Sequence, residues 1–175
     1  IRRMLINKIK TFKQYTEFLK KNENEIDLLY QDLLINVTEF FRDAEAFDVL
    51  KKSIFPLLLK NKSKKETMRI WVSACATGEE VYSIAMILSE LQGANANHIP
   101  FQIFASDLSE TAINFARNGV YSTQQLKNVS PKRLQQFFTK SGEKYRISKS
   151  LRDVCVFAHH NIFAFCQIGS GYIRC

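Results

Sequence analysis

Features that mark membrane proteins, secreted proteins and metal proteins are missing from this sequence of 175 residues. No apolar run approaches the roughly 20 residues that a membrane-spanning helix needs, so we expect no insertion into a membrane. No secretory signal peptide opens the chain, which favours a cytoplasmic location. The four cysteines form no C-x-x-C pair and lack the spacing of metal ligands. We therefore expect reduced thiols and no metal site.

Concentrated charge is also missing, although the net charge is +8 at neutral pH. Such a balance would permit binding to nucleic acid, to an anionic membrane or to an acidic protein. The lysines are scattered, however, and the run KNKSKK at 60–65 is typical of a solvated linker. Because no cluster of aromatic residues for base stacking accompanies them, we expect no nucleic-acid partner.

The most informative stretch is RIWVSACATGEEVYSIAMILSEL, at 69–91. It opens with a short apolar run at 70–72, which indicates a buried strand, and continues through small residues to Gly78. The next apolar residues have the i, i+3, i+4, i+7 spacing of a helix face: Val81, Ile84, Ala85 and Leu88. A strand, a turn and a helix form the first half of a βαβ unit, which binds ligands at the carboxyl end of its strand.

The residues of this turn indicate what kind of ligand it takes. A dinucleotide site needs bare N–H groups at the helix start and the pattern G-x-G-x-x-G, whereas this turn contains only Gly78. Glu79 and Glu80 follow directly and would repel a pyrophosphate. A phosphate-free nucleoside with positive charge, such as S-adenosylmethionine, fits better. The alternative is structural, since Thr77-x-x-Glu80 is also a capping box and acids are ordinary partners of a helix dipole.

A second carboxylate ends the next expected strand, FQIFASD at 101–107. In Rossmann-like sheets an acid at this position accepts hydrogen bonds from ribose hydroxyls, and such charge-assisted bonds contribute about 1.5–3 kcal/mol each. Asp107 is therefore a candidate ribose ligand. In the alternative, Asp107 and Ser109 only cap the helix that follows.

The remaining patterns predict the organisation of the chain. Helical periodicity predicts an N-terminal helical subdomain at 1–60, with its first helix over 1–20. The linker then leads to a cofactor-binding domain at 68–175. A turn-rich segment at 121–150 indicates an insertion with its own small sheet, and the buried-strand pattern resumes at 154–157. The predicted fold class is α/β, a Rossmann-like sheet with an N-terminal helical subdomain and a small inserted antiparallel β subdomain.

Six motifs follow one another at suitable spacing: INVTEFFRD at 35–43, ATGEEVYSIAM at 76–86, FASD at 104–107, ARNGVY at 116–121, VSPKRL at 129–134 and HNI at 160–162. Together they resemble the CheR family, the chemotaxis receptor glutamate methyltransferases. The element N-x-T-x-F-F-R is the specific one. The resemblance covers nearly the whole chain up to about Phe163, and implies the methyltransferase form of the Rossmann-like sheet.

The resemblance implies transfer of a methyl group from S-adenosylmethionine to glutamates of a methyl-accepting chemotaxis receptor. The products are glutamyl methyl esters and S-adenosylhomocysteine. Carried over by motif, these residues belong to the cofactor and substrate cleft: Asn36, Thr38, Arg42, Gly78, Glu79, Asp107, Asn161 and Ile162. Glu79 is expected at the methionine end of the cofactor, Asp107 at the ribose and Asn161 with Ile162 at the adenine.

Arg42 is the expected catalytic residue. A glutamate carboxylate is already ionised at neutral pH, so its methylation needs no general base. The enzyme must instead hold one carboxylate oxygen in line with the methyl carbon and the sulfur, which a forked arginine pair can do. No Ser-His-Asp or Cys-His constellation is therefore expected, and His159 and His160 need no catalytic role. Phe40 and Phe41, inside the motif, are expected to pack in the core.

The chain departs from the family pattern at two places. Val81 stands where the family has proline, which alters only the helix start. After Asn161 the family continues to a further cofactor-contacting strand, whereas this chain reads AFCQIGSGYIRC at 164–175, a tail that resembles a shifted reading frame. We therefore expect an incomplete sheet, a free sheet edge, poor solubility and an inactive, C-terminally truncated fragment.

Two other functions stay open on the sequence. The first is a non-catalytic, S-adenosylmethionine-binding signalling module of a larger fused protein. The second is a methyltransferase that binds nucleic acid, which only the net charge supports. The sequence indicates no oligomeric state.

Overall fold

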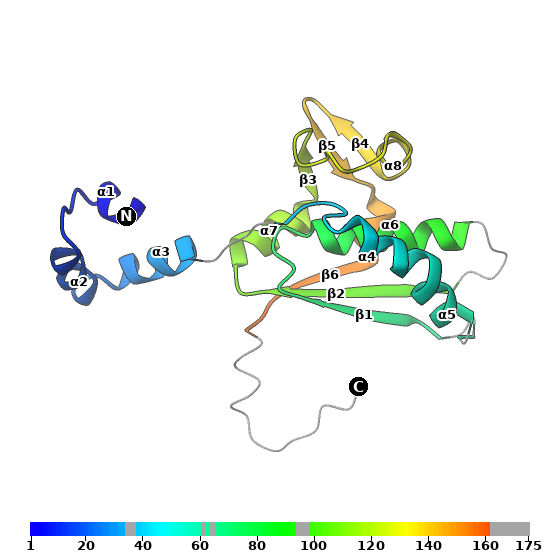
Figure 1. The fold of residues 1–175 in the computed structure, drawn as a ribbon, viewed down its shortest axis with the longest axis horizontal. Helices are drawn as coiled ribbons and strands as arrows, with labels where there is room; N and C mark the ends of the chain where they lie inside the picture. Colours follow the sequence, from blue (N-terminus) through cyan, green and yellow to red (C-terminus); the bar gives the residue numbers. More distant parts are fainter. Residues whose placement is uncertain (34–37, 61, 64–65, 94–98, 162–175) are drawn as a thin grey trace, which may run out of the picture. The chain divides into compact units, whose positions relative to one another are not determined.

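The computed structural model describes residues 1–33, 38–60, 62–63, 66–93 and 99–161 (Figure 1). Its contacts divide the chain into two compact units, Ile1–Ile35 and Asn36–Cys175. The second unit therefore includes the helices at 44–60 that the sequence assigned to the helical subdomain. The functional division at 60–68 stays a prediction. Within the described ranges, no helix is long and apolar enough to cross a membrane.

The first unit holds the helices α1 (Arg2–Ile6), α2 (Phe12–Lys20) and α3 (Glu23–Leu33). The predicted single helix over 1–20 is wrong, because α1 ends at Ile6 and α2 begins only after Thr11, whose side chain accepts a hydrogen bond from the N–H of Gln14. The centre of this unit is a carboxylate. Glu25 is 4% exposed. It accepts hydrogen bonds from Arg3 (2.9 Å), Asn7 (2.9 Å) and Tyr15 (2.8 Å).

The second unit begins with one continuous helical stretch: α4 (Ala44–Val49), the π-helical turn η1 (Leu50–Ile54) and α5 (Phe55–Lys60). Asp43 caps α4 by accepting from the N–H of Ala46 at 3.2 Å. The π turn ends at Ile54, two residues before Pro56, whose missing N–H removes one helical hydrogen bond. Lys51 of η1 reaches Glu90 of the helix α6 (Glu79–Gly93) at 2.6 Å. This ion pair joins the segment to the α/β part.

The parallel sheet contains β1 (Met68–Ser73), β2 (Phe101–Asp107) and β6 (Cys155–His159), in the order β1-β2-β6. The helices α6 (Glu79–Gly93) and α7 (Glu110–Asn118) follow β1 and β2. Figure 1 shows the helices of this unit on one side of the sheet. The register aligns Ile70, Ile103 and Cys155 on the helix-covered face. The predicted α/β class and the three expected strands are confirmed.

The helix α6 is buried on more than one side. Its predicted face is confirmed, since Val81, Ile84, Ala85 and Leu88 are all buried. Tyr82, Met86 and Ile87 are buried as well. The reason is that α6 contacts the sheet through β2 and β6 and also contacts η1. A helix enclosed in this way needs apolar residues around most of its circumference.

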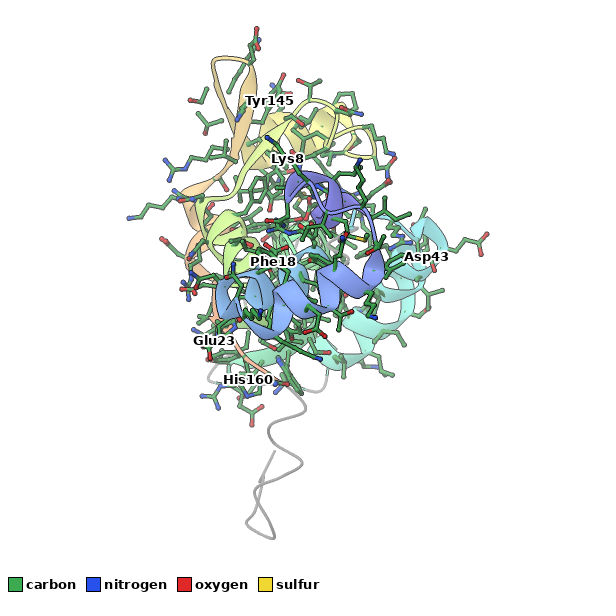
Figure 2. All side chains as sticks on the ribbon, turned by 90° about the vertical axis from the view of Figure 1, so that its left-hand side faces the viewer. Lys8, Phe18, Glu23, Asp43, Tyr145 and His160 are labelled. Carbon is green, nitrogen blue, oxygen red and sulfur yellow. The ribbon has the colours of Figure 1, made fainter. Side chains whose placement is uncertain are left out.

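The insertion forms the predicted antiparallel sheet, in the order β3-β5-β4. Its elements are β3 (Val120–Ser122), α8 (Pro131–Phe137), β4 (Phe138–Ser141), β5 (Lys144–Ile147) and α9 (Lys149–Asp153). Gly119, with φ of 60°, ends α7 in the left-handed conformation that glycine adopts without strain. In Figure 2, Tyr145 of the hairpin and His160 after β6 lie at opposite ends of this unit. The β4–β5 hairpin therefore lies away from the end of β6.

Candidate functional site

The candidate site is built where the three parallel strands end. The register pairs Ser73 with Ser106, and Asp107 with His159, so the carboxyl ends of the strands meet at one edge of the sheet. The N–H of His160 donates to the carbonyl oxygen of Asp107 at 3.0 Å. This bond brings Asn161, the next residue, beside the end of β2. Open α/β sheets bind ligands at such an edge.

The turn between β1 and α6 has an unusual backbone. Ala74, Ala76 and Gly78 have φ values of 53°, 45° and 91°. A Cβ on Gly78 would lie 2.8 Å from the Cβ of Ala116, which is closer than van der Waals contact. The N–H of Cys75 donates to the carbonyl oxygen of Ser106 at 3.0 Å and ties the turn to β2. Left-handed alanines are strained, and such strain persists where the surrounding structure holds it.

The carboxylate of Asp107 joins this turn to the start of α7. One oxygen accepts from the N–H of Ala76 at 2.8 Å, and the other accepts from the N–H of Ser109 at 2.8 Å. The cap of α7 itself is Ser109, whose hydroxyl oxygen accepts from the N–H of Ala112 at 3.2 Å. Each carboxylate oxygen has a further lone pair, so ribose hydroxyls can still donate to Asp107. The capping alternative is thus partly right, and the ribose role stays a prediction.

Glu79 is a buried carboxylate at the start of α6. It is 2% exposed although it opens a helix. Its Oε2 accepts from Thr77 Oγ1 at 2.6 Å, and its Oε1 accepts from Gln125 Nε2 at 3.4 Å. Burial raises the pKa of this carboxyl, and no cation among the described residues counteracts that rise. A buried carboxylate without a cation is costly, so the site is suited to a ligand that brings one.

Glu80, the next residue, is exposed to solvent, whereas Glu79 is buried. The sequence offered a capping box between Thr77 and Glu80 as the structural alternative. In the structure the Thr77 hydroxyl donates to Glu79, its neighbour but one. The two adjacent acids are thereby separated into a buried group and a solvated group.

The N-x-T-x-F-F-R segment is held by its two phenylalanines, as predicted. Phe40 is fully buried, edge-on to Tyr121 with ring centroids 4.9 Å apart. Phe41 is buried as well, and its N–H donates to Ser83 Oγ of α6 at 3.1 Å. Thr38 is half-buried and Arg42 is exposed. Arg42 lines a groove of about 400 Å³ together with Asp48, Lys51, Asn128 and Arg133.

The structure brings some of the predicted site residues together. Gly78 and Glu79 lie where the turn meets α6, Asp107 accepts from the N–H of Ala76 in the same turn, and Asn161 follows β6 beside β2. The segment with Thr38 and Arg42 joins this turn through Tyr121, because the Tyr121 hydroxyl donates to the carbonyl oxygen of Thr77 at 2.7 Å. Asn36 and Ile162 lie outside the described residues. The roles assigned to all of these residues stay predictions.

Sequence reasoning missed Gln125 and gave Tyr121 no role. Gln125 lies 46 positions after Glu79, inside the insertion. No local pattern announces a contact over that distance. Tyr121 did stand inside the motif ARNGVY, and its place in that motif is the signal that would have been available.

Residues 36–169 match the family described as CheR methyltransferase, SAM binding domain. A chemotaxis protein methyltransferase of Borreliella burgdorferi is 34% identical over 164 residues, which cover 89% of this chain and 58% of that protein. The chemotaxis protein methyltransferase of Escherichia coli is 31% identical over 171 residues, 94% of this chain and 56% of that protein. An uncharacterised 104.1 kDa protein of Rhodobacter capsulatus is 31% identical over 163 residues, 93% of this chain and 17% of that protein.

The chain spans about half the length of the chemotaxis methyltransferases that it matches. The match includes the strained turn, the buried carboxylate and the strand-end aspartate described above. The chain belongs to the CheR methyltransferase family and carries its S-adenosylmethionine-binding domain.

Proposed function

We propose that this chain supplies the cofactor-binding part of an enzyme that methylates glutamate side chains of chemotaxis receptors. The observation that carries the proposal is the buried carboxylate of Glu79, which has no cation among the described groups that set its pKa. S-Adenosylmethionine carries an ammonium and a sulfonium and no phosphate, and when bound it supplies an electrophilic methyl group. The chain's residues match this chemistry in charge and in position.

Glu79 binds the ammonium, in this proposal, and Asp107 accepts from the ribose hydroxyls. Gly78 lets the turn approach closely, since a side chain there would collide with Ala116. Asn161 and Ile162 face the adenine. The edge of the sheet thereby contacts the cofactor from its methionine end to its base.

Arg42 orients the substrate glutamate, with Thr38 lining the same cleft. No residue has to remove a proton, because the attacking carboxylate is ionised at neutral pH. The rate gain comes from holding one carboxylate oxygen in line with the methyl carbon. A two-pronged guanidinium pair fixes that direction, and the exposed position of Arg42 allows a protein substrate to reach it.

The partner is a methyl-accepting chemotaxis receptor, and the location is the cytoplasm. For the isolated 175 residues we keep the prediction that methyl transfer is lost, since the chain spans about half of the matched enzymes. No metal is required by this chemistry. Among the described residues, no cluster of histidine, cysteine and carboxylate side chains has the arrangement of a metal site.

A second candidate is a non-catalytic, cofactor-binding signalling module of a larger fused protein. The similarity to the 104.1 kDa protein of Rhodobacter capsulatus, of which the matched region is 17%, favours it. The two candidates differ in a single observation on the complete protein. Cofactor binding without methyl transfer to a receptor would favour the module.

The adjacent pair Glu79 and Glu80 provides a matched test of the cofactor site. Glu79→Gln should weaken binding of S-adenosylhomocysteine to this chain by tenfold or more, because a charge-assisted contact of about 1.5–3 kcal/mol is lost. The same substitution should raise the unfolding temperature, since it removes a buried charge. Isothermal titration calorimetry and thermal unfolding measure the two effects.

Glu80→Gln, at the exposed neighbour, should change neither quantity. Equal losses in the two variants would show that general charge, and not the buried carboxylate, attracts the cofactor. No binding by a complete protein that contains this chain would overturn the proposed function of this domain.

A further inference from the structure

One turn of the insertion, residues 122–129, reaches back to the cofactor site. Its contact to that site is the side-chain amide of Gln125. The amide oxygen accepts from the N–H of Ser122 at 3.0 Å and from Ser122 Oγ at 3.1 Å. A flipped amide would set its NH₂ group against the N–H of Ser122, donor against donor. The NH₂ group must therefore face outward from the turn, and there it meets Glu79 Oε1 at 3.4 Å.

Glu79 depends on neutral donors, because none of the described groups that set its pKa carries a positive charge. Thr77 donates to Oε2, the oxygen that Gln125 does not reach. Two further ionisable groups interact with Glu79, the Cys75 thiol and the Tyr121 hydroxyl, and burial raises the pKa of both. Both are therefore neutral at physiological pH. Gln125 is the one described side chain from outside the 74–79 turn that donates to this carboxylate.

The same turn also holds the other half of the candidate site. Lys127 and Asn128 donate to the two oxygens of Glu39 at 2.9 and 3.0 Å. Glu39 lies within the segment that carries Thr38 and Arg42. Residues 122–129 therefore contact both the cofactor turn and the substrate segment, although the three segments are far apart in sequence.

We propose that Gln125 is a positioning residue, which holds the Glu79 carboxylate oriented toward the cofactor's ammonium and makes the insertion part of the cofactor site. This inference rests on the proposed function for the identity of the cation. The contact between Gln125 and Glu79 does not depend on the proposed function. Gln125, a residue of the inserted β subdomain, is thereby assigned a role in the cofactor site.

Loss of this donor should affect the charged form of Glu79 more than the neutral form. A hydrogen bond to the ionised carboxylate favours ionisation, so its removal raises the pKa of Glu79 further. At neutral pH the affinity for S-adenosylhomocysteine should then fall roughly 3- to 10-fold, and the loss should grow as the pH is lowered.

Two variants separate the donor from the packing. Gln125→Glu keeps an acceptor for Ser122, and replaces the donor with a second carboxylate that must share a proton with Glu79. Gln125→Met keeps the length of the side chain and removes its polar atoms. Lys127→Ala is the matched control, since it lies in the same turn and contacts Glu39 instead of Glu79.

The decisive measurement is the pKa of Glu79 in each chain without cofactor, from the pH dependence of its side-chain carboxyl ¹³C shift. Both Gln125 variants should raise it, by about half a unit or more for Gln125→Met, and Gln125→Glu should raise it further. Lys127→Ala should leave it unchanged. An unchanged pKa in either folded Gln125 variant overturns the positioning role.

Calorimetry with S-adenosylhomocysteine, from pH 5.5 to 8, distinguishes failure of the positioning role from failure of the proposed cofactor binding. If the unaltered chain binds and Gln125→Met binds equally well at every pH, only the positioning role fails. If a complete protein that contains the unaltered chain does not bind, the proposed function fails, and the Glu79 titration still decides whether Gln125 orients that carboxylate.

Discussion

At the scale of one residue, the buried carboxylate of Glu79 lowers the stability of the folded chain at neutral pH. Its pKa is raised by burial, so between its ordinary value and that raised value the folded chain binds more protons than the unfolded chain. Stability therefore falls as the pH rises through this window, and the group costs free energy at neutral pH. A bound cation offsets that cost. Asp107 is different, because backbone N–H groups satisfy both of its oxygens.

Arg42 is predicted to line the cofactor and substrate cleft and to orient the substrate carboxylate. In a complete protein that contains this chain, Arg42→Ala should abolish methyl transfer to a receptor, because the attacking carboxylate loses its orientation. Binding of S-adenosylhomocysteine should stay within about threefold of the original. A radiolabelled-methyl assay and calorimetry measure the two.

Lys52→Ala is a suitable control, since Lys52 pairs only with the exposed Asp48 among its described contacts. Methyl transfer that survives Arg42→Ala undiminished would remove Arg42 from the mechanism and would favour a different orienting residue.

The turn at 74–78 shows at the scale of an element how the backbone builds the site. Its conformation is held because the N–H of Cys75 donates to the carbonyl oxygen of Ser106 and the N–H of Ala76 donates to Asp107. The strain of two left-handed alanines is offset by those bonds. The turn type was readable from its small residues. Its φ values could not be predicted from the sequence, because alanine rarely adopts a left-handed conformation.

Gly78→Ala should destabilise the fold by about 1–3 kcal/mol and should also impair cofactor binding. The new Cβ would lie 2.8 Å from that of Ala116, at a φ of 91° that alanine rarely adopts. Chemical denaturation and calorimetry test the two effects. Gly93→Ala serves as the control, because a Cβ there meets nothing within 4 Å. Equal stability of the two variants would contradict the close packing under the turn.

The first helices show where periodicity misleads. Apolar residues continue across 1–20 in a helical stripe, but the chain turns between α1 and α2. Arg3, Asn7 and Tyr15 all reach Glu25 in this arrangement. A polar centre of this kind leaves no mark in hydrophobic spacing, since its members lie on three different helices.

At the scale of the whole molecule, the two compact units depend on different forces. The second unit buries a continuous apolar core between sheet, α6 and insertion. The first unit is arranged around the ion pair of Glu25 with Arg3. Hydrogen bonds from Arg3 are the main cause that lowers the pKa of Glu25 to about 2.

The first unit should therefore be sensitive to acid. The stabilisation by Glu25 is complete above the pKa of an ordinary glutamate, 4.5, and is lost as the pH falls from about 4.5 toward about 2. The amide protection factors of residues 2–33 in the whole chain, which correct for the intrinsic pH dependence of exchange, should fall in this window. Glu25→Gln should be exchange-labile already at neutral pH, whereas Glu17→Gln, at an exposed pair, should behave like the original chain. Protection that does not change with pH would contradict the ion pair.

The sheet of the second unit has one apolar face without a helix among the described residues. Trp71, Phe104 and Val156 are aligned across the three strands and are 59%, 38% and 39% exposed. Among the described strands β1 pairs only with β2. An exposed apolar face is thus present among the described residues, and the poor solubility expected from the sequence stays a prediction.

The sequence by itself determined the α/β class, the three strands, the α6 face, the insertion and the family, because these follow from local periodicity, turn residues and short motifs. Only the tertiary structure decided which acids are buried and which residues surround them. Glu79 and Glu80 are neighbours of identical chemistry, and one is enclosed while the other is solvated. That difference depends on Tyr121 and Gln125, some 40 residues away along the chain. Burial and long-range hydrogen bonds are properties of the packed chain, so no local pattern encodes them.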